Sequence, residues 1–388
     1  MHTLHLGTIP AKLWLDDVEA GATAQIKNLS NLPFAFSHIA IMPDSHQGYG
    51  MPIGGVLATR DVIVPNAVGV DIGCGMCAVR TSLLVADLDA ETLKLVMGDV
   101  RKAVPVGFSK HETECDLAAM PELGDRPLPV VRRELPNARK SLGTLGGGNH
   151  FIEIQKGSDG HIWVMIHSGS RNLGKQVCDH YNALAVELNK TSLPSVPAEW
   201  ELAYLPVDSP QGKDYAQEMA YCLNFAFANR KAMMARIMEA FAARKPGISF
   251  GDVINIHHNY AALERHFGQD VWVHRKGATL ATKETVGLIP GSQGTKSYVV
   301  RGKGNPDSFN SCSHGAGRRV SRAKAQAELD LKTEIRRLDD LGVVHGIRNQ
   351  KDLDEAAGAY KDIDVVMNNQ RDLVDVLVEL TPYGVIKG

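Results

Sequence analysis

The sequence predicts an α+β protein built as one compact domain over residues 1–388. Two observations lead to this fold class: long segments have helical periodicity, and short β-branched or aromatic runs typical of strands occur between them. A third observation bears on the domain count. At ~150 residues per domain the length allows two or three domains, but no repeat, low-complexity tract or linker divides the chain.

Three segments are expected to be helices. Residues 217–244 are rich in strong helix formers and place apolar side chains on one face. Residues 171–190 also have a helical pattern and follow a glycine-rich turn. Residues 319–341 alternate charged residues with Ala and Leu, which predicts a solvated helix.

Three short runs are expected to be strands: residues 161–167 (HIWVMIH), 270–274 (DVWVH) and 297–301 (SYVVR). A proline divides residues 61–70 into a predicted strand and a loop. Residues 121–136 are rich in Pro and Arg, which indicates a surface loop.

Composition excludes several classes of protein. With 44% hydrophobic residues the chain can bury a core, and a net charge of −2 excludes a uniformly basic nucleic-acid binder. No apolar run approaches the ~18 residues of a membrane span, and the N-terminus has no signal-peptide pattern. The six cysteines are scattered, which favours reduced thiols and a cytoplasmic location over a disulfide framework.

Glycine-rich segments carry residues that can bind a metal. Residues 42–55 include Asp44 and His46 among four glycines. In GVDIGCGMC, Asp71 and Cys74 lie three residues apart on a predicted tight turn, where both can reach one ion. A buried cysteine beside a capping aspartate explains the same pair.

A second glycine-rich segment, LGTLGGGNHFIEI, precedes a predicted strand. Its three consecutive glycines allow a ligand to approach the backbone at Asn149 and His150. The strand alternation places Phe151 and Glu153 on one face. A simple hairpin turn is the alternative interpretation.

Two further segments contain candidate histidines. In VMIHSGSRNLG, His167 ends a strand and Arg171 lies near a helix N-terminus, a favourable position for an anion. A plain N-cap would explain Ser168 and Ser170 nearly as well. In INIHHNY, His257 and His258 face different ways if extended, so at most one of them is expected to bind a given ion.

Together these segments offer one carboxylate, one thiolate and three imidazoles. A single zinc ion uses three or four protein ligands, so five candidates indicate two ions with the thiolate able to bridge them. Thiolate and imidazole suit zinc, and the carboxylate also admits manganese or iron. The sequence leaves the metal open.

Basic residues are concentrated in one C-terminal segment. Residues 301–324 contain six Lys and Arg but only one acid, Asp307, a local charge of +5. His314 lies there among small residues and beside arginines, an arrangement suited to a phosphorylated ligand. A loop that leads into the following helix is the simpler alternative.

The motifs, taken in order, resemble those of the RtcB family of RNA-splicing ligases. They run from residue 42 to residue 388 and include MPDSHQGYGMPIGG, VGVDIGCGM, LGGGNHFIEI, HSGSRNLG, HHNY, HRKGAT, IPGSQGTKSY, SHGAGR, AYKDID and VIKG. The resemblance implies a single RtcB-like domain, with mixed β-sheets and surrounding helices around a deep metal-containing cleft.

The resemblance also implies an activity, namely a GTP- and Mn²⁺-dependent RNA ligase. Such an enzyme joins an RNA 3′-phosphate or 2′,3′-cyclic phosphate to a 5′-hydroxyl end, in tRNA splicing or RNA repair. His314 matches the family's nucleophile, which forms a covalent histidine–GMP and then an RNA-ppG end. Archease is a candidate activating partner, and a monomer is expected.

The family's binding residues match residue by residue. The resemblance implies one manganese on Cys74, His167 and His258, and a second on Asp71, Cys74 and His150. Guanosine contacts would come from Asn149, Phe151, Glu153, Ser292, Ser297, Ala316, Gly317, Tyr360 and Lys387. Phosphate or RNA contacts would come from Arg171, Arg318 and Arg322.

Two departures and two competing functions accompany this prediction. Gln293 stands beside the guanosine residues where the family commonly has methionine, and Cys77 has no family role. A metal-dependent phosphoesterase would use the metal ligands without a covalent guanylate. An RNA-end binding protein would need neither a thiolate nor a nucleophile.

Overall fold

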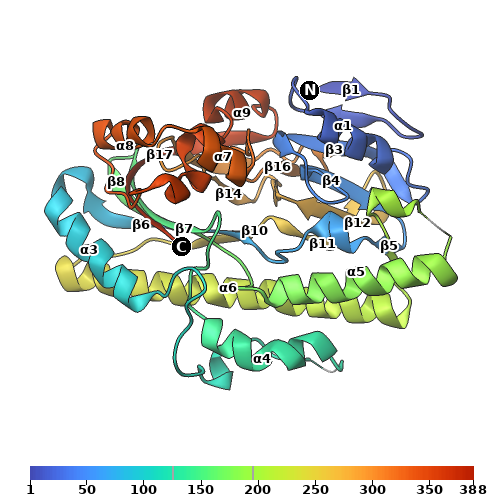
Figure 1. Ribbon diagram of the computed structural model, residues 1–388, viewed down its shortest axis with the longest axis horizontal. Helices are drawn as coiled ribbons and strands as arrows, with labels where there is room; N and C mark the ends of the chain where they lie inside the picture. The colour runs from blue at the N-terminus through green and yellow to red at the C-terminus, as the bar shows by residue number, and fades with distance from the viewer. Residues whose placement is uncertain (125, 195) are drawn as a thin grey trace.

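The computed structural model describes residues 1–124, 126–194 and 196–388 and has an α+β fold with two large sheets (Figure 1). The six-stranded sheet has the order β1 (His2–Leu4), β2 (Ala11–Leu13), β3 (Ala35–His46), β4 (Ile53–Thr59), β12 (Gln269–Lys276), β11 (Asn259–His266). The seven-stranded sheet has the order β10 (Ile254–His257), β6 (Gly75–Leu84), β8 (His161–Ser168), β7 (Phe151–Gly157), β17 (Val374–Lys387), β15 (Ser297–Gly302), β14 (Val286–Ile289).

The six-stranded sheet is mixed because β2 and β3 pair in parallel, whereas the seven-stranded sheet is antiparallel. Two short ladders complete the strands: β13 (Ala278–Leu280) with β16 (Ser311–Ser313), and β5 (Val62–Ile63) with β9 (Leu205–Pro206).

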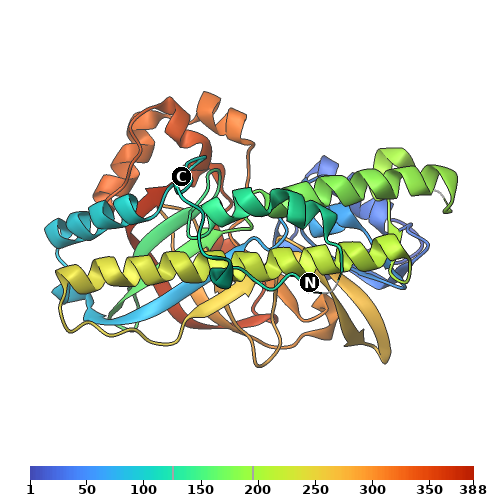
Figure 2. The same ribbon diagram turned by 90° about the horizontal axis from the view of Figure 1, so that it is seen from below.

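The α-helices are α1 (Ala20–Leu29), α2 (Pro65–Val68), α3 (Ala90–Ala103), α4 (Pro129–Ser141), α5 (Leu173–Thr191), α6 (Pro210–Arg244), α7 (Arg322–Glu328), α8 (Leu331–Asp340) and α9 (Ile363–Asn369). Short 3₁₀ turns occupy Val85–Asp87, Leu117–Ala119, Ala198–Trp200, Pro306–Ser308, Gln350–Glu355 and Ala357–Ala359. In Figure 1, α4, α5 and α6 lie below the strands and α7, α8 and α9 lie above them. Figure 2 shows α6 running along most of the molecule.

The long helix α6 packs between helix α3 and the seven-stranded sheet. Its side chains Met233, Met234 and Ile237 are buried in one cluster with residues of α3 and of strands β7 and β8. The helix begins earlier than the periodicity predicted, because Pro210 occupies its first turn and the Ser209 side chain accepts a hydrogen bond from the Gly212 N–H.

Several predicted elements are confirmed, and three are wrong in part. Strands β8, β12 and β15 and helix α5 occur where the sequence predicted them. The predicted helix at residues 319–341 is two helices, because Asp330 caps α8 by accepting the Thr333 N–H. The predicted loop after β5 is instead the helical turn α2.

The prediction of a surface loop at residues 121–136 is wrong in its second half, because residues 129–136 belong to α4. Residue 125 lies outside the described residues. Pro129 occupies the first turn of α4, where a missing N–H costs nothing. The buried Glu218 on α6 accepts the N–H groups of Val130 and Val131 at 2.8 and 3.0 Å. This cap comes from a distant segment, so the local sequence did not indicate the helix.

The class prediction of an α+β fold is confirmed, while the deep metal-containing cleft remains a prediction. All six cysteines are free thiols. Within the described residues, no helix combines the length and the apolar character that crossing a membrane requires.

Candidate metal and nucleotide site

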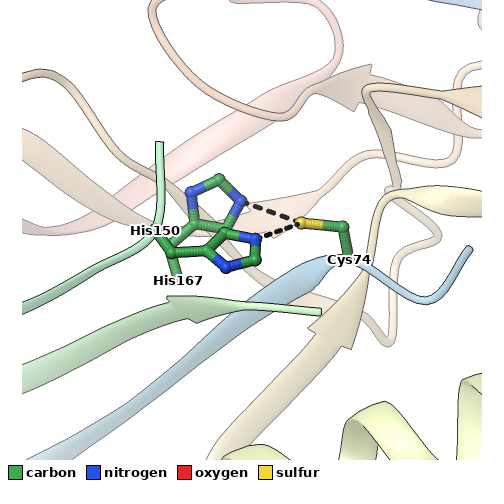
Figure 3. A group of neighbouring side chains, drawn as sticks. All are labelled: Cys74, His150 and His167. Carbon is green, nitrogen blue, oxygen red and sulfur yellow. Dashed lines mark hydrogen bonds between the residues drawn. The ribbon is translucent and has the colours of Figure 1, made fainter. Parts of the chain in front are cut away.

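Three buried side chains converge to form a metal-capable cluster (Figure 3). The Cys74 sulfur lies 3.5 Å from His150 Nε2 and 3.3 Å from His167 Nε2. Each residue offers one ligand atom to the cluster, and these three atoms lie within 4.8 Å of one another. A thiolate and two imidazoles at this spacing can share one ion.

Strand register brings the three residues together. His167 lies in β8, which pairs with β6 on one side and with β7 on the other. Cys74 immediately precedes β6, where Gly75 pairs with Ser168. His150 immediately precedes β7, where Phe151 pairs with His167. The two glycine-rich turns therefore end against the same part of β8.

Two more predicted ligands extend the cluster at opposite ends. Asp71 Oδ2 lies 3.3 Å from His150 Nε2, and His258 Nε2 lies 3.4 Å from His167 Nε2. The five side chains thus form a row with Cys74 in the middle. Such a row offers two ligand sets that share the Cys74 sulfur.

The structure distinguishes between the two adjacent histidines. His258 donates its backbone N–H to the Cys74 carbonyl at 2.9 Å and points into the cluster. His257 instead lies beside the buried Arg230, which donates to His257 Nδ1 at 3.1 Å. Of the alternatives the sequence left open, only His258 reaches the other candidate ligands.

The electrostatics of the cluster fit a bound cation. Burial lowers the pKa of His167 and of His258 well below the usual value, so both imidazoles are neutral, as metal ligands must be. His150 Nδ1 donates to the Leu145 carbonyl at 3.0 Å, which leaves Nε2 free to face the cluster. Burial, aided by the Asp71 charge, raises the pKa of Cys74 well above its usual value. A cation bound beside Cys74 would lower the pKa of its thiol again, and the resulting thiolate would become a ligand of that cation.

A cavity of about 700 Å³ lies beside the cluster. His167 contributes to its wall, and so does His314. All nine residues predicted to contact guanosine line this cavity: Asn149, Phe151, Glu153, Ser292, Ser297, Ala316, Gly317, Tyr360 and Lys387. The volume is in the range of small-molecule sites. The structure therefore brings the predicted guanosine residues to one place.

The partner of His314 was not predicted from the sequence. Asp44 Oδ2 accepts from His314 Nδ1 at 2.6 Å and from the His314 backbone N–H at 3.1 Å. The Asp44 side chain is fully buried. This pairing fixes the ring so that Nε2 remains for a reaction. The glycine-rich segment around Asp44 was a signal, but nothing in it named a partner 270 residues away.

A buried carboxylate, Glu355, was also missed. It accepts from the Tyr360 hydroxyl and from Arg322 Nε at 2.7 Å, and it forms an ion pair with Arg318 at 3.0 Å. Gln293 donates to the Glu355 carbonyl at 2.9 Å and lines the same cavity. Glu355 thus positions the two predicted phosphate-binding arginines at the cavity. No sequence signal indicated it.

Arg171 lies outside the residues that line the cavity. It donates to Thr144 Oγ1 at 2.7 Å and to the Gly107 carbonyl at 3.0 Å, next to the glycine-rich turn before His150. The Ser170 hydroxyl accepts the Gly174 N–H at 2.9 Å in the first turn of α5, but the N-cap residue of this helix is Asn172, whose side chain makes no capping hydrogen bond.

The cluster of Cys74, His150 and His167 places this α+β protein in the class of candidate metal-binding proteins. The comparisons narrow this class, and the chain belongs to the RtcB family. The family model described as "tRNA-splicing ligase RtcB" matches residues 25–127 and 120–388.

Relatives match over nearly the full length. An RNA-splicing ligase RtcB of Escherichia coli K12 is 40% identical, with 98% of this chain and 97% of the relative aligned. A tRNA-splicing ligase RtcB of Nanoarchaeum equitans is 32% identical, with 98% and 95% aligned. An RNA-splicing ligase RtcB of Mycobacterium tuberculosis is 33% identical, with 94% and 100% aligned.

Proposed function

We propose that this chain, acting as one unit over residues 1–388, is a GTP- and Mn²⁺-dependent RNA ligase. It joins an RNA 3′-phosphate or 2′,3′-cyclic phosphate to a 5′-hydroxyl end, in tRNA splicing or RNA repair. One observation carries the proposal: His314, held by Asp44, faces the cavity lined by the predicted guanosine residues and stands next to the metal-capable cluster. The rings of His314 and His258 lie 4.8 Å apart.

The first step forms a covalent histidine–GMP. The lone pair of His314 Nε2 attacks the α-phosphorus of GTP, and the bond from that phosphorus to the bridging oxygen breaks. Pyrophosphate leaves with the bonding electrons. Asp44 stabilises the positive charge that the imidazole ring acquires, because its carboxylate accepts the Nδ1 proton in a hydrogen bond.

Two further transfers complete the ligation. An oxygen of the RNA 3′-phosphate attacks the same phosphorus, and the broken N–P bond returns its electrons to His314. The product is an RNA-ppG end. The 5′-hydroxyl oxygen then attacks the RNA phosphorus, its proton passes to solvent, and GMP leaves. A cyclic phosphate must first be opened by water to a 3′-phosphate.

Two ligand sets in the row would hold the metal ions. Cys74, His167 and His258 would form one set, and Asp71, Cys74 and His150 the other. Manganese bound there would supply Lewis-acid stabilisation of the charge that develops on the phosphoryl oxygens. Archease remains our candidate activating partner, and a monomer our expected working form.

A ligation assay tests the proposal. The purified protein is incubated with one RNA bearing a 3′-phosphate and another bearing a 5′-hydroxyl, with and without GTP and with and without Mn²⁺. We expect a joined product only when both GTP and Mn²⁺ are present. Release of inorganic phosphate with no joined product would instead identify a phosphoesterase, and would overturn the proposal.

We predict that guanosine binding strengthens as pH rises toward 8. Burial raises the pKa of Glu153 to about 8, although the Gln155 amide and the nearby Lys387 charge both oppose this shift. The guanine N–H groups donate hydrogen bonds to the ionised form of the Glu153 carboxylate. Below this pKa the carboxyl is protonated, so it must release its proton when guanosine binds. Affinity should rise about tenfold per pH unit and then level off above a pH of about 8. Calorimetric titration with guanosine at several pH values measures this affinity.

Two variants of Glu153 serve as controls for this prediction. Glu153→Gln should bind guanosine weakly and with no pH dependence over the same range. Glu153→Ala should weaken discrimination between GTP and ATP more than it weakens Mn²⁺ binding. Equal losses of Mn²⁺ and GTP affinity in Glu153→Ala would contradict the assignment of this residue to guanine.

A further inference from the structure

Part of the cavity wall is formed by residues outside the predicted guanosine set. Residues 46–49 (HQGY) line it, together with Ile53 at the start of β4. This segment, which we call the HQGY loop, connects β3 to β4. None of its residues belongs to the predicted guanosine set.

The HQGY loop begins beside the reacting histidine. His46 Nδ1 hydrogen-bonds the carbonyl of Asp44, the residue that holds His314. At the other end, Ile53 and the His314 ring flank Gly277, where an added Cβ would lie 2.4 Å from Ile53 and 3.1 Å from His314. Ile53 therefore places this part of the cavity near the His314 ring, where the proposed reaction would put the phosphorus.

The backbone of the HQGY loop is held from several sides. The N–H of Gln47 donates to the Glu19 carboxylate, and the N–H of Gly48 donates to Gln25 at 3.1 Å. The buried Lys276 donates its ammonium to the Tyr49 carbonyl at 2.5 Å. After the loop, the Gly50 N–H donates to Glu201 at 3.0 Å. These bonds fix the loop before any ligand binds.

The fixed loop presents a large aromatic side chain to solvent. Tyr49 is 68% exposed, although its neighbour Gly50 is buried. An aromatic ring carried by a fixed backbone at the edge of a nucleotide-sized cavity offers a stacking surface for a base, since every base has a flat π-face. A preformed stacking surface also spares the ordering cost that a mobile loop would incur on binding.

Two basic side chains near this part of the cavity can contact the phosphates of a nucleic acid. Arg319 lines the same cavity, and its side chain is exposed and donates to the Gly358 carbonyl at 3.2 Å. Lys361 donates its ammonium to the Ser45 carbonyl, at the start of the loop. The acid in this wall, Glu19, already accepts the Gln47 N–H.

We propose that the HQGY loop forms a second nucleotide subsite, and that Tyr49 stacks on the base of the 3′-terminal nucleotide of the RNA. The inference rests on the proposed ligase function. The 3′-phosphate must approach the phosphorus on His314, so the nucleotide that carries it occupies the remaining part of the same cavity. Of the three predicted phosphate or RNA contacts, Arg318 and Arg322 line this cavity and Arg171 does not.

The test measures transfer of GMP from labelled protein to RNA in a single turnover. Protein is labelled with GTP, freed of nucleotide and mixed with increasing amounts of 3′-phosphorylated RNA. Each rate is normalised to the label on the protein. We expect Tyr49→Ala to raise the half-saturating RNA concentration about 5- to 150-fold. Tyr49→Phe, which keeps the ring, should behave as wild type.

An RNA whose 3′-terminal nucleotide lacks its base identifies the occupant. For the wild type, this abasic RNA should require the same increase in concentration as Tyr49→Ala requires with normal RNA. For Tyr49→Ala, removal of the base should cause no further loss. Such non-additivity would place the terminal base on the Tyr49 ring.

Three outcomes would overturn the subsite. Tyr49→Ala could match the wild type, which would also be the result if the ring serves a protein partner. The abasic RNA could weaken Tyr49→Ala as much as the wild type. Finally, the non-additivity between Tyr49→Ala and removal of a base could appear only for an RNA that lacks the base of its 5′-hydroxyl terminal nucleotide. Thermal unfolding of each variant verifies that the fold is intact.

Failure of the ligase proposal would be seen separately, as absence of label on the wild-type protein. In that case, fluorescence anisotropy with a 3′-phosphorylated oligonucleotide and its abasic counterpart still tests the subsite on the same variants. Equal binding of both oligonucleotides by the wild type would then overturn it.

Discussion

We expect His314→Ala to take up no label from α-labelled GTP, a loss of about 10⁴-fold or more. Asp44 holds Nδ1 of the wild-type imidazole and leaves Nε2 for the α-phosphorus, and alanine offers no replacement nucleophile. The measurement is incubation with labelled GTP and Mn²⁺ followed by denaturing electrophoresis. The label on the wild type should be lost in acid and kept in alkali, as expected of a phosphorus–nitrogen bond.

The same variant separates the ligase from the competing functions. Labelling of His314→Ala at the wild-type rate would contradict the assignment of the nucleophile. Phosphoester hydrolysis that survives in His314→Ala but is lost in Cys74→Ala would identify a phosphoesterase. Binding of RNA ends with no sealing at any Mn²⁺ concentration would favour the RNA-end binding protein.

Asp44→Asn should slow labelling without preventing it. The amide can still accept the Nδ1 hydrogen bond, but it lacks the charge that stabilises the ring once the phosphorus is bound. We expect a decrease of about 10²- to 10⁴-fold in the maximal labelling rate. The GTP concentration for half-maximal rate should stay the same, because Asp44 holds His314 and does not line the cavity. A change in that concentration alone would contradict this positioning role.

The sequence indicated the candidate ligands by residue type, but their convergence depends on strand register. Cys74 and His167 lie far apart in the chain and meet because β6 pairs with β8. The pairing partner of a short strand is not encoded in its own residues. For the same reason the residue pattern alone did not distinguish His257 from His258, and only the family resemblance favoured His258, since the choice depends on Arg230 from α6.

The roles of residues that act through distant partners could not be predicted from the sequence for a related reason. Glu355 lies in none of the quoted motifs, and the motif that contains Asp44 indicates no partner for it. The roles of both residues follow from the side chains that the fold places against them. Helix α4 shows the same effect at the level of the fold, because its first turn is capped by Glu218. Local patterns predicted α5, β8 and β12 well, since these elements carry their own periodicity.

We expect Cys74→Ala to lose most of its affinity for Mn²⁺, by at least about 100-fold. The Cys74 sulfur lies between the two ligand sets, within 3.5 Å of both His150 and His167, so its removal affects both. Loss of one outer ligand, in His258→Ala, should leave the set of Asp71, Cys74 and His150 able to bind an ion. Calorimetry with Mn²⁺ and metal analysis of the purified protein measure these changes.

Cys77→Ala is the matched control, because it removes the other thiol of the CxxC pair. Cys77 is buried among apolar residues such as Val79 and Ile166, and burial raises the pKa of its thiol to about 12, so it behaves as a small hydrophobic side chain. The variant should lose some stability, through the cavity it leaves, and keep its Mn²⁺ affinity. Equal loss of metal in both variants would show that the two thiols act as a pair. Unchanged Mn²⁺ affinity in Cys74→Ala would exclude the shared thiolate, and with it the two-ion arrangement.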